Sequence, residues 1–279
     1  MAVLVGVFRA VVPAGAQSSD VMLAVVRGTA LQPIARFDGR TWEAPGPSAR
    51  WPRQWLRWSF PASGSQSITA ALRQAGSRCA APGTMVLESV ASADGVEASA
   101  GVATSAAAPV MPVRPVIRGS RTWNAAASSL APLFESGARR NGVSPPVLAR
   151  VAAVIDAMYV SENGGAPVYY LESSKRVPDA GGTPQEDPKG VVRLALSGWF
   201  RADGQRLVAA ATKTELHWEA VENRGTAAAP MLEPLAVLRE PARDLWVMES
   251  DVAGRKSYAL YAVTQSAVRV LVATEAARC

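Results

Sequence analysis

One short segment carries cationic and aromatic side chains at a spacing that could bind an anion or a sugar. Three arginines alternate with three tryptophans there: Arg50, Trp51, Arg53, Trp55, Arg57 and Trp58. Tryptophan rings stack on sugars or bases, and guanidinium groups pair with phosphates or carboxylates. The segment therefore suggests a surface for an anionic polymer or glycan. The competing interpretation, favoured by Pro52 and the close Trp spacing, is a strand and turn whose tryptophans pack in the core while the arginine heads reach water.

The chain has a single histidine, His217, which excludes zinc sites built from several histidines. A Ser-His-Asp triad would have to use it. Glu215 and Glu219 lie two residues away on either side, a pattern typical of an exposed strand face. The common phosphate-loop, dinucleotide, nucleophile-elbow, metalloprotease and Cys-x-x-Cys motifs do not occur. The sequence thus identifies no catalytic residue, no metal and no cofactor, and favours a protein that is not an enzyme.

Paired carboxylates keep one enzymatic alternative open, a secreted carbohydrate-acting hydrolase with a Trp-lined cleft. The pairs are Glu162 with Glu172, Glu215 with Glu219, and Glu249 with Asp251. Glycoside hydrolysis needs two carboxyl groups about 5–10 Å apart across a cleft. Residues two apart on a strand share a face and approach the short end of that range. Exposed strands of any β protein offer such pairs, so the pattern has little specificity.

The N-terminal residues bear on the compartment. Residues 1–16 form an apolar run that ends in Ala14-Gly15-Ala16, and a polar stretch follows from Gln17. This order resembles the end of a secretory signal peptide, although Arg9 interrupts the run and no basic residue precedes it. The alternative is a first buried strand over 3–12. We expect export to the periplasm, the envelope or the extracellular space.

Two cysteines, Cys79 and Cys279, are compatible with a disulfide if the protein is exported. Their bridge would close a loop of about 200 residues, for which chain entropy gives roughly 5 kcal/mol at most. The alternative is that the two cysteines do not pair, with one thiol buried and the other free at the surface.

Composition indicates a packed protein rather than a disordered one, because 49% of the 279 residues are hydrophobic and 19% are charged. No run of about 18 apolar residues follows the N-terminal segment, so the sequence predicts no transmembrane helix. The net charge of +6 comes mainly from arginines that are spread along the chain. This pattern favours a solvated surface and carries no specific nucleic-acid signal.

Alternating apolar runs separated by turn residues predict many strands. Asp38-Gly39 and Asp203-Gly204 mark tight hairpin turns. The predicted strands cover residues 21–26, 31–37, 54–60, 67–74, 84–90, 191–200, 207–211, 214–221, 235–238, 245–249, 256–263 and 268–273.

Helical spacing of apolar residues predicts one helix over 123–140, with Pro132 as the site of a kink. Residues 147–160 fit both a helix and a strand. We favour the strand, because Asn163-Gly164-Gly165 and a second β-rich run follow it.

A faint internal repeat is also present. Leu31–Ala35 and Leu232–Ala236 share the pattern L-x-P-(I/L)-A, each before a tryptophan. Chance explains so short a match well, but related sheet units would produce it too. The prediction is a mainly β protein of antiparallel sheets, as a sandwich or a small propeller-like array, with about one helix. It occupies residues 17–279, and an Ala/Ser/Pro-rich stretch at 91–115 is a candidate flexible loop or linker within it. The alternative for this stretch is that it contains a strand near Val96 to Val102. The function that fits best is an exported, non-catalytic binding or structural protein.

Overall fold

The computed structural model describes twelve stretches of the chain: residues 21–28, 30–46, 51–58, 65–71, 85–89, 101–143, 150–162, 166–178, 190–204, 206–220, 232–252 and 255–274. These stretches form three antiparallel β-sheets and two consecutive helices. The predicted fold class, mainly antiparallel β with one helical region, is therefore confirmed. Residues 1–16, Arg50, Cys79 and Cys279 lie outside the described residues.

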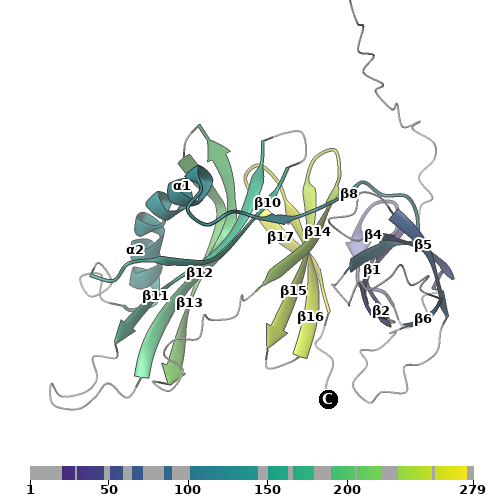
Figure 1. Ribbon diagram of the computed structural model, residues 1–279, viewed down its shortest axis with the longest axis horizontal. Coiled ribbons are helices and arrows are strands. Elements are labelled where there is room, and N and C mark those ends of the chain that lie inside the picture. Colours follow the sequence, from purple (N-terminus) through teal and green to yellow (C-terminus); the bar gives the residue numbers. More distant parts are fainter. Residues whose placement is uncertain are drawn as a thin grey trace, which may run out of the picture.

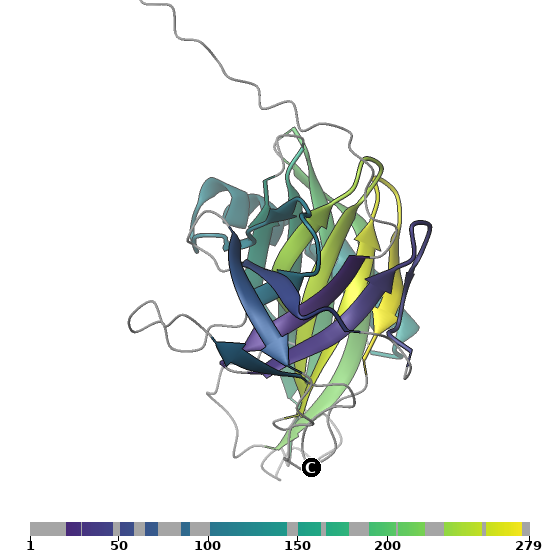
Figure 2. The same ribbon diagram turned by 90° about the vertical axis from the view of Figure 1, so that its right-hand side faces the viewer.

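The first sheet, here called the N-terminal sheet, faces the viewer in Figure 2. Its strands are β1 (Val21–Arg27), β2 (Ala30–Phe37), β3 (Trp42–Glu43), β4 (Gln54–Trp58), β5 (Ser65–Ala71), β6 (Met85–Ser89) and β7 (Gly101–Thr104). They are ordered β1-β7-β4-β5-β6-β2-β3, and β1 also pairs with β2, so the sheet curls. Within the stretch 91–115, residues 101–104 thus form a buried strand between β1 and β4.

The second sheet carries the helices on one face and is called the helix-covered sheet. It is a meander of β10 (Val154–Ser161), β11 (Val168–Pro178), β12 (Gly190–Asp203) and β13 (Arg206–Ala220), with short β9 (Arg114–Pro115) at one edge. The strand favoured over 147–160 is confirmed for residues 154–160, which pair with β11 as a hairpin. The predicted start is wrong, because residues 150–153 are not part of the strand, and residues 147–149 lie outside the described residues. The two separate strands predicted at 207–211 and 214–221 are one long strand, β13, which continues through a bulge.

The third sheet, the middle sheet, is a second meander. It contains β14 (Glu233–Arg239), β15 (Asp244–Val252), β16 (Arg255–Val263) and β17 (Val268–Ala273), with short β8 (Val110–Met111) beside β14.

The helices and the three sheets stack as four layers, in the order helices, helix-covered sheet, middle sheet and N-terminal sheet (Figure 1). One apolar core fills each gap between layers, and a further core lies inside the curl of the N-terminal sheet. The sheets lie face to face, which corresponds to the sandwich alternative extended by one sheet rather than to radial blades.

Strand β15 shows why the middle sheet can be covered on both sides. Leu245 and Val247 point into the core shared with the N-terminal sheet, while Trp246 and Met248 point into the core shared with the helix-covered sheet. All four are fully buried. Because successive side chains alternate between faces, a strand with two buried faces must be apolar throughout.

The helical region is divided where the sequence places its proline. Helix α1 (Arg121–Ser129) begins at Ser120, whose Oγ accepts a hydrogen bond from the Trp123 amide at 3.2 Å. Helix α2 (Ala131–Arg140) begins after Leu130 and carries Pro132 in its first turn, where the missing N–H costs nothing. A stripe at every fourth position is buried against the sheet across this break: Ala126, Leu130, Phe134 and Ala138.

The short internal repeat has a structural counterpart. In both copies the residue after the proline, Ile34 in β2 and Leu235 in β14, is an extra residue with no opposite partner. It forms a β-bulge, a position where the ladder is already interrupted and a proline without an N–H is tolerated. The alanine that follows is fully buried in each case.

Strands β12 and β13 lie so close together at Gly198 that a larger side chain does not fit there. A Cβ added there would lie 2.9 Å from the Thr212 Cα and would also collide with the Ala211 carbonyl, both in the backbone of β13. Gly198→Ala is expected to lower the free energy of unfolding by about 1–3 kcal/mol in urea titrations, because backbone atoms must shift. Gly46→Ala is the control, since Gly46 has open space around it. Equal effects at the two positions would contradict this account.

Candidate functional site

The candidate site lies at one end of the seam between the N-terminal and middle sheets, and an aromatic pair forms one wall. Phe37 and Trp42 face each other across the β2–β3 hairpin, with ring centroids 5.3 Å apart. Asp38 holds the turn by accepting hydrogen bonds from the Thr41 and Arg40 amides at 2.7 and 2.8 Å. These bonds, led by that from Thr41, lower the pKa of Asp38. Gly39 supplies the positive φ of 94° that the turn needs.

A second part of the site comes from small side chains. Residues 106–109 are three alanines and a proline, and this segment is fastened at both ends by backbone bonds. The Ser105 amide donates to the Met22 carbonyl at 2.9 Å, and the Arg239 amide donates to the Pro109 carbonyl at 3.0 Å. The segment is therefore held between β1 and the end of β14.

Both sets of residues line a cavity of about 270 Å³. Twelve of the described residues line it, and ten of these are apolar; Leu238 and Leu245 of the middle sheet are buried among them. The other two, Arg239 and Glu240, are polar. A concave apolar space with few polar groups is the usual form of a small-molecule site.

Glu240 ties the two sheets together beside the cavity. Its carboxylate accepts a hydrogen bond from the Trp42 indole at 2.8 Å and one from the Arg243 Nε at 2.6 Å. One bond comes from β3 of the N-terminal sheet and the other from the β14–β15 turn. Glu240, the one carboxylate in the described part of the lining, thus joins the two sheets at this place.

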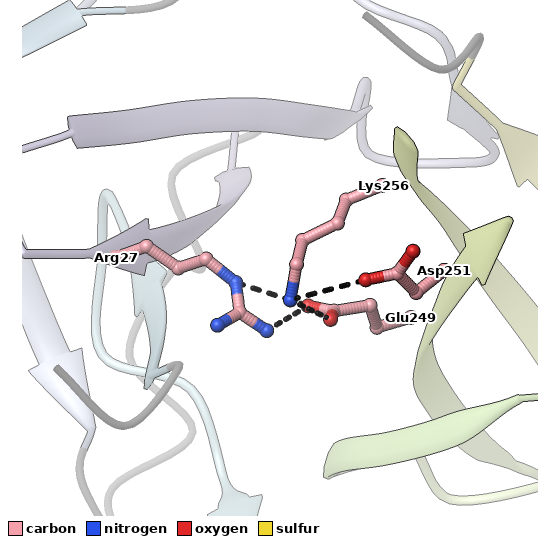
Figure 3. Close-up of polar contacts among 4 residues, drawn as sticks. All are labelled: Arg27, Glu249, Asp251 and Lys256. Atoms are coloured by element: carbon pink, nitrogen blue, oxygen red, sulfur yellow. Dashed lines mark hydrogen bonds and ion pairs between the residues drawn. The ribbon is translucent and has the colours of Figure 1, made fainter. Parts of the chain in front are cut away.

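An ionic cluster occupies the other end of β1. Arg27 and Lys256 converge on Glu249, as Figure 3 shows. Lys256 Nζ lies 2.7 Å from Glu249 Oε1, and Arg27 Nε lies 3.1 Å from Oε2. Glu249 is 3% exposed, whereas Arg27 and Lys256 are about one-third exposed. Burial raises the pKa of the adjacent Tyr258, which also hydrogen-bonds to Arg27 and Glu249. This cluster joins the N-terminal sheet to the middle sheet.

A second buried carboxylate, Glu172, lies on the face of β11 that is turned toward the middle sheet. It accepts a hydrogen bond from the Tyr170 hydroxyl at 2.8 Å and one from the Leu232 amide at 2.7 Å. Burial and the nearby Glu172 charge raise the pKa of Tyr170 far above its ordinary value. Tyr170 therefore remains a protonated donor at physiological pH.

The structure places the arginine and tryptophan segment along β4 and the turn before it. Trp55 is buried inside the curl of the N-terminal sheet, and Trp51 packs against the same core. Trp58 packs on the other face, and its indole donates to Thr104 Oγ1 at 3.2 Å. Arg53 is exposed and Arg57 is partly buried. Binding of an anionic polymer or glycan by this segment stays a prediction.

The other predicted chemical groups are dispersed. His217 is half-buried on β13 beside Arg193, and Arg193 pairs with Asp156 at 3.2 Å. Glu215 lies 2.5 Å from Lys213. No group of three potential metal ligands among His, Cys, Asp and Glu occurs within the described residues.

The carboxylate pairs that sequence analysis considered for hydrolysis serve different contacts. Glu249 and Asp251 both contact Lys256, at 2.7 and 3.9 Å. Glu172 is buried, whereas Glu162 is exposed. None of these residues lines the cavity described above.

Sequence reasoning missed the cavity. The Asp38-Gly39 turn correctly predicted the hairpin that presents Trp42, but nothing in the sequence linked it to residues 106–109 or to Glu240. The run of three alanines before Pro109 was the one available signal, since small side chains leave space.

Comparison with known proteins adds no relative: the chain matches no protein-family model, no curated protein and no solved structure. No helix in the part of the chain that the structure describes has the length and apolar character needed to cross a membrane.

Proposed function

We propose that this chain is a non-catalytic binding or structural protein of the cell envelope or the extracellular space. The observation that supports the binding role is the cavity beside Phe37 and Trp42, in which the described lining residues are apolar apart from Arg239 and Glu240. The carboxylate of Glu240 already accepts hydrogen bonds from Trp42 and Arg243. The support for export is the Ala14-Gly15-Ala16 pattern of the sequence.

The alternative, hydrolysis of a carbohydrate, needs two carboxyl groups across a cleft, one of which must gain and lose a proton. Glu240 is the one carboxylate among the described residues that line the cavity. The buried Glu249 is instead held between Arg27 and Lys256, in a cluster that joins two sheets. These arrangements favour binding over hydrolysis.

The binding role is tested with the full chain and two assays. Equilibrium dialysis against the uncharged dye N-phenyl-1-naphthylamine is expected to give saturable binding of about one dye per chain, with the dye recovered unchanged. A panel of aryl glycosides and polysaccharides is expected to show no turnover. A glycan-cleaving activity that copurifies with the folded protein through two further columns would contradict the proposal.

Export is tested separately, by fractionating cells that express the chain and sequencing the N-terminus of the recovered protein. The proposal expects an exported form that begins near Gln17. A protein retained in the cytoplasm with residue 1 or 2 at its N-terminus would contradict the export claim and leave the binding assays unaffected.

A further inference from the structure

We propose that the cavity between the N-terminal and middle sheets holds one unbranched alkyl chain of an acylated molecule, with the polar end of that molecule outside. This inference rests on the proposed binding function and names the ligand class for it. The carrying observation is the apolar lining of this cavity, here called the slot, to which the segment 106–109 contributes four consecutive residues and the Phe37–Trp42 pair contributes two rings.

The size of the cavity limits what it can hold. A volume of about 270 Å³ exceeds the roughly 150 Å³ of an apolar cavity that takes up benzene. It lies just below the range of about 300–1,000 Å³ typical of sites for drug-sized ligands. One chain of moderate length fits this space, whereas a complete two-chain lipid or a nucleotide does not.

The polar groups argue against a sugar as the buried part of the ligand. Sugar hydroxyls need hydrogen-bond partners when they leave water, and an unpartnered hydroxyl is costly to bury. Of the two polar residues in the described lining, Glu240 directs its oxygens to Trp42 and Arg243, and Arg239 is exposed. The interior therefore presents mainly methyl, methylene and ring surfaces.

The segment 106–109 favours an alkyl chain over a compact group. All four of its residues have small side chains and line the cavity, and backbone bonds at both ends hold the segment in place. The segment thus presents a row of small apolar groups along its length, which an extended alkyl chain can contact at successive methylenes.

The first experiment is a titration of the full chain with 1-hexanol, 1-heptanol, 1-octanol and 1-decanol by isothermal calorimetry. Each added methylene is expected to raise the affinity about fourfold while the chain still fits. The increase should stop once the slot is full. The compact 1-adamantanol is expected to bind at least tenfold more weakly than 1-octanol. Absence of saturable binding by every alkanol would overturn the inference, as would preference for 1-adamantanol.

The second experiment blocks the slot. Ala107 is exposed and lines the cavity, so Ala107→Trp can occupy part of the cavity without disturbing a core. The variant is expected to bind 1-octanol at least tenfold more weakly with an unchanged thermal midpoint. Ala127→Trp, at an exposed position on α1, is the matched control and should bind as the original protein does. Unchanged octanol binding by folded Ala107→Trp would overturn the assignment to this cavity.

Two further ligands, a lysophospholipid and dodecanoate, distinguish the possible sources of the bound alkyl chain. Binding of a single-chain lysophospholipid with an affinity close to that of dodecanoate supports an acyl chain taken from a membrane lipid. Binding of dodecanoate alone supports a free fatty acid. Failure of both, together with retained binding of N-phenyl-1-naphthylamine, would overturn the alkyl inference while leaving the binding function intact. Glycan turnover would instead overturn the proposed function itself.

Discussion

Replacing Glu249 by alanine is expected to lower the free energy of unfolding by about 3 kcal/mol in urea titrations followed by circular dichroism. The carboxylate is 3% exposed and joins Arg27 of the N-terminal sheet to Lys256 of the middle sheet. Removing one partner of a buried ionic contact typically costs about 3–5 kcal/mol, because the remaining charges lose their compensation. The lower end applies here, since both cations are about one-third exposed and regain some water.

Asp251→Asn is the matched control for this prediction. Asp251 lies two residues further along β15 and contacts the same Lys256, at 3.9 Å, but it is 45% exposed. Exposed ion pairs contribute about 0–1 kcal/mol. The two variants should therefore differ by at least about 2 kcal/mol. Similar losses for both would show that Glu249 does not act as the bridge between the sheets.

Trp246→Ala is expected to lower the free energy of unfolding by about 3–5 kcal/mol, because it removes a fully buried side chain and leaves a cavity. The indole fills the core between the middle and helix-covered sheets and meets the ring of Trp199 edge-on, with centroids 6.5 Å apart. Trp246→Phe is expected to cost less than about 1.5 kcal/mol, since it keeps most of the apolar volume. It also removes a buried indole N–H that has no acceptor among the described residues.

A comparison of Trp55→Phe with Trp246→Phe separates the effect of lost side-chain volume on stability from that of a lost hydrogen bond. Trp55 is also buried, but its indole donates to the Pro52 carbonyl at 2.9 Å. The phenylalanine variant loses that bond as well as volume, so it is expected to cost about 1 kcal/mol more than Trp246→Phe. A larger loss for Trp246→Phe than for Trp55→Phe would mean that the indole N–H of Trp246 is bonded in solution.

Local patterns predicted most of the strands and their tight turns. Asp38-Gly39 placed the β2–β3 hairpin, because glycine reaches the required positive φ and aspartate caps the turn amides. Pro132 correctly marked the interruption between α1 and α2, because a proline is tolerated in the first turn of a helix but not in its interior. Strand β7 was harder to place, since four small and apolar residues within an Ala/Ser/Pro-rich stretch have no distinctive period.

The roles of particular side chains were harder to predict than the strands. The sequence indicated residues 50–58 as a candidate binding segment, but the structure places Trp55 of that segment in a core. It did not indicate Trp42 as a candidate, although Trp42 lines the cavity. Both are tryptophans beside turns. What distinguishes them is the layer on which each one packs, and that depends on the curl of the sheet.

Strand positions, the helix break and the proline bulges at Ile34 and Leu235 could be read from residues close together in the chain, because backbone sterics and side-chain alternation act over a few residues. Other features depend on the tertiary structure alone. They are the stacking of the three sheets, the contact between Arg27 and Glu249, and the cavity lined by residues 37, 42, 106–109 and 240. These contacts join segments up to 222 residues apart. The burial of apolar faces brings such segments together, and because the hydrophobic effect is not directional, local sequence does not show which segments will meet.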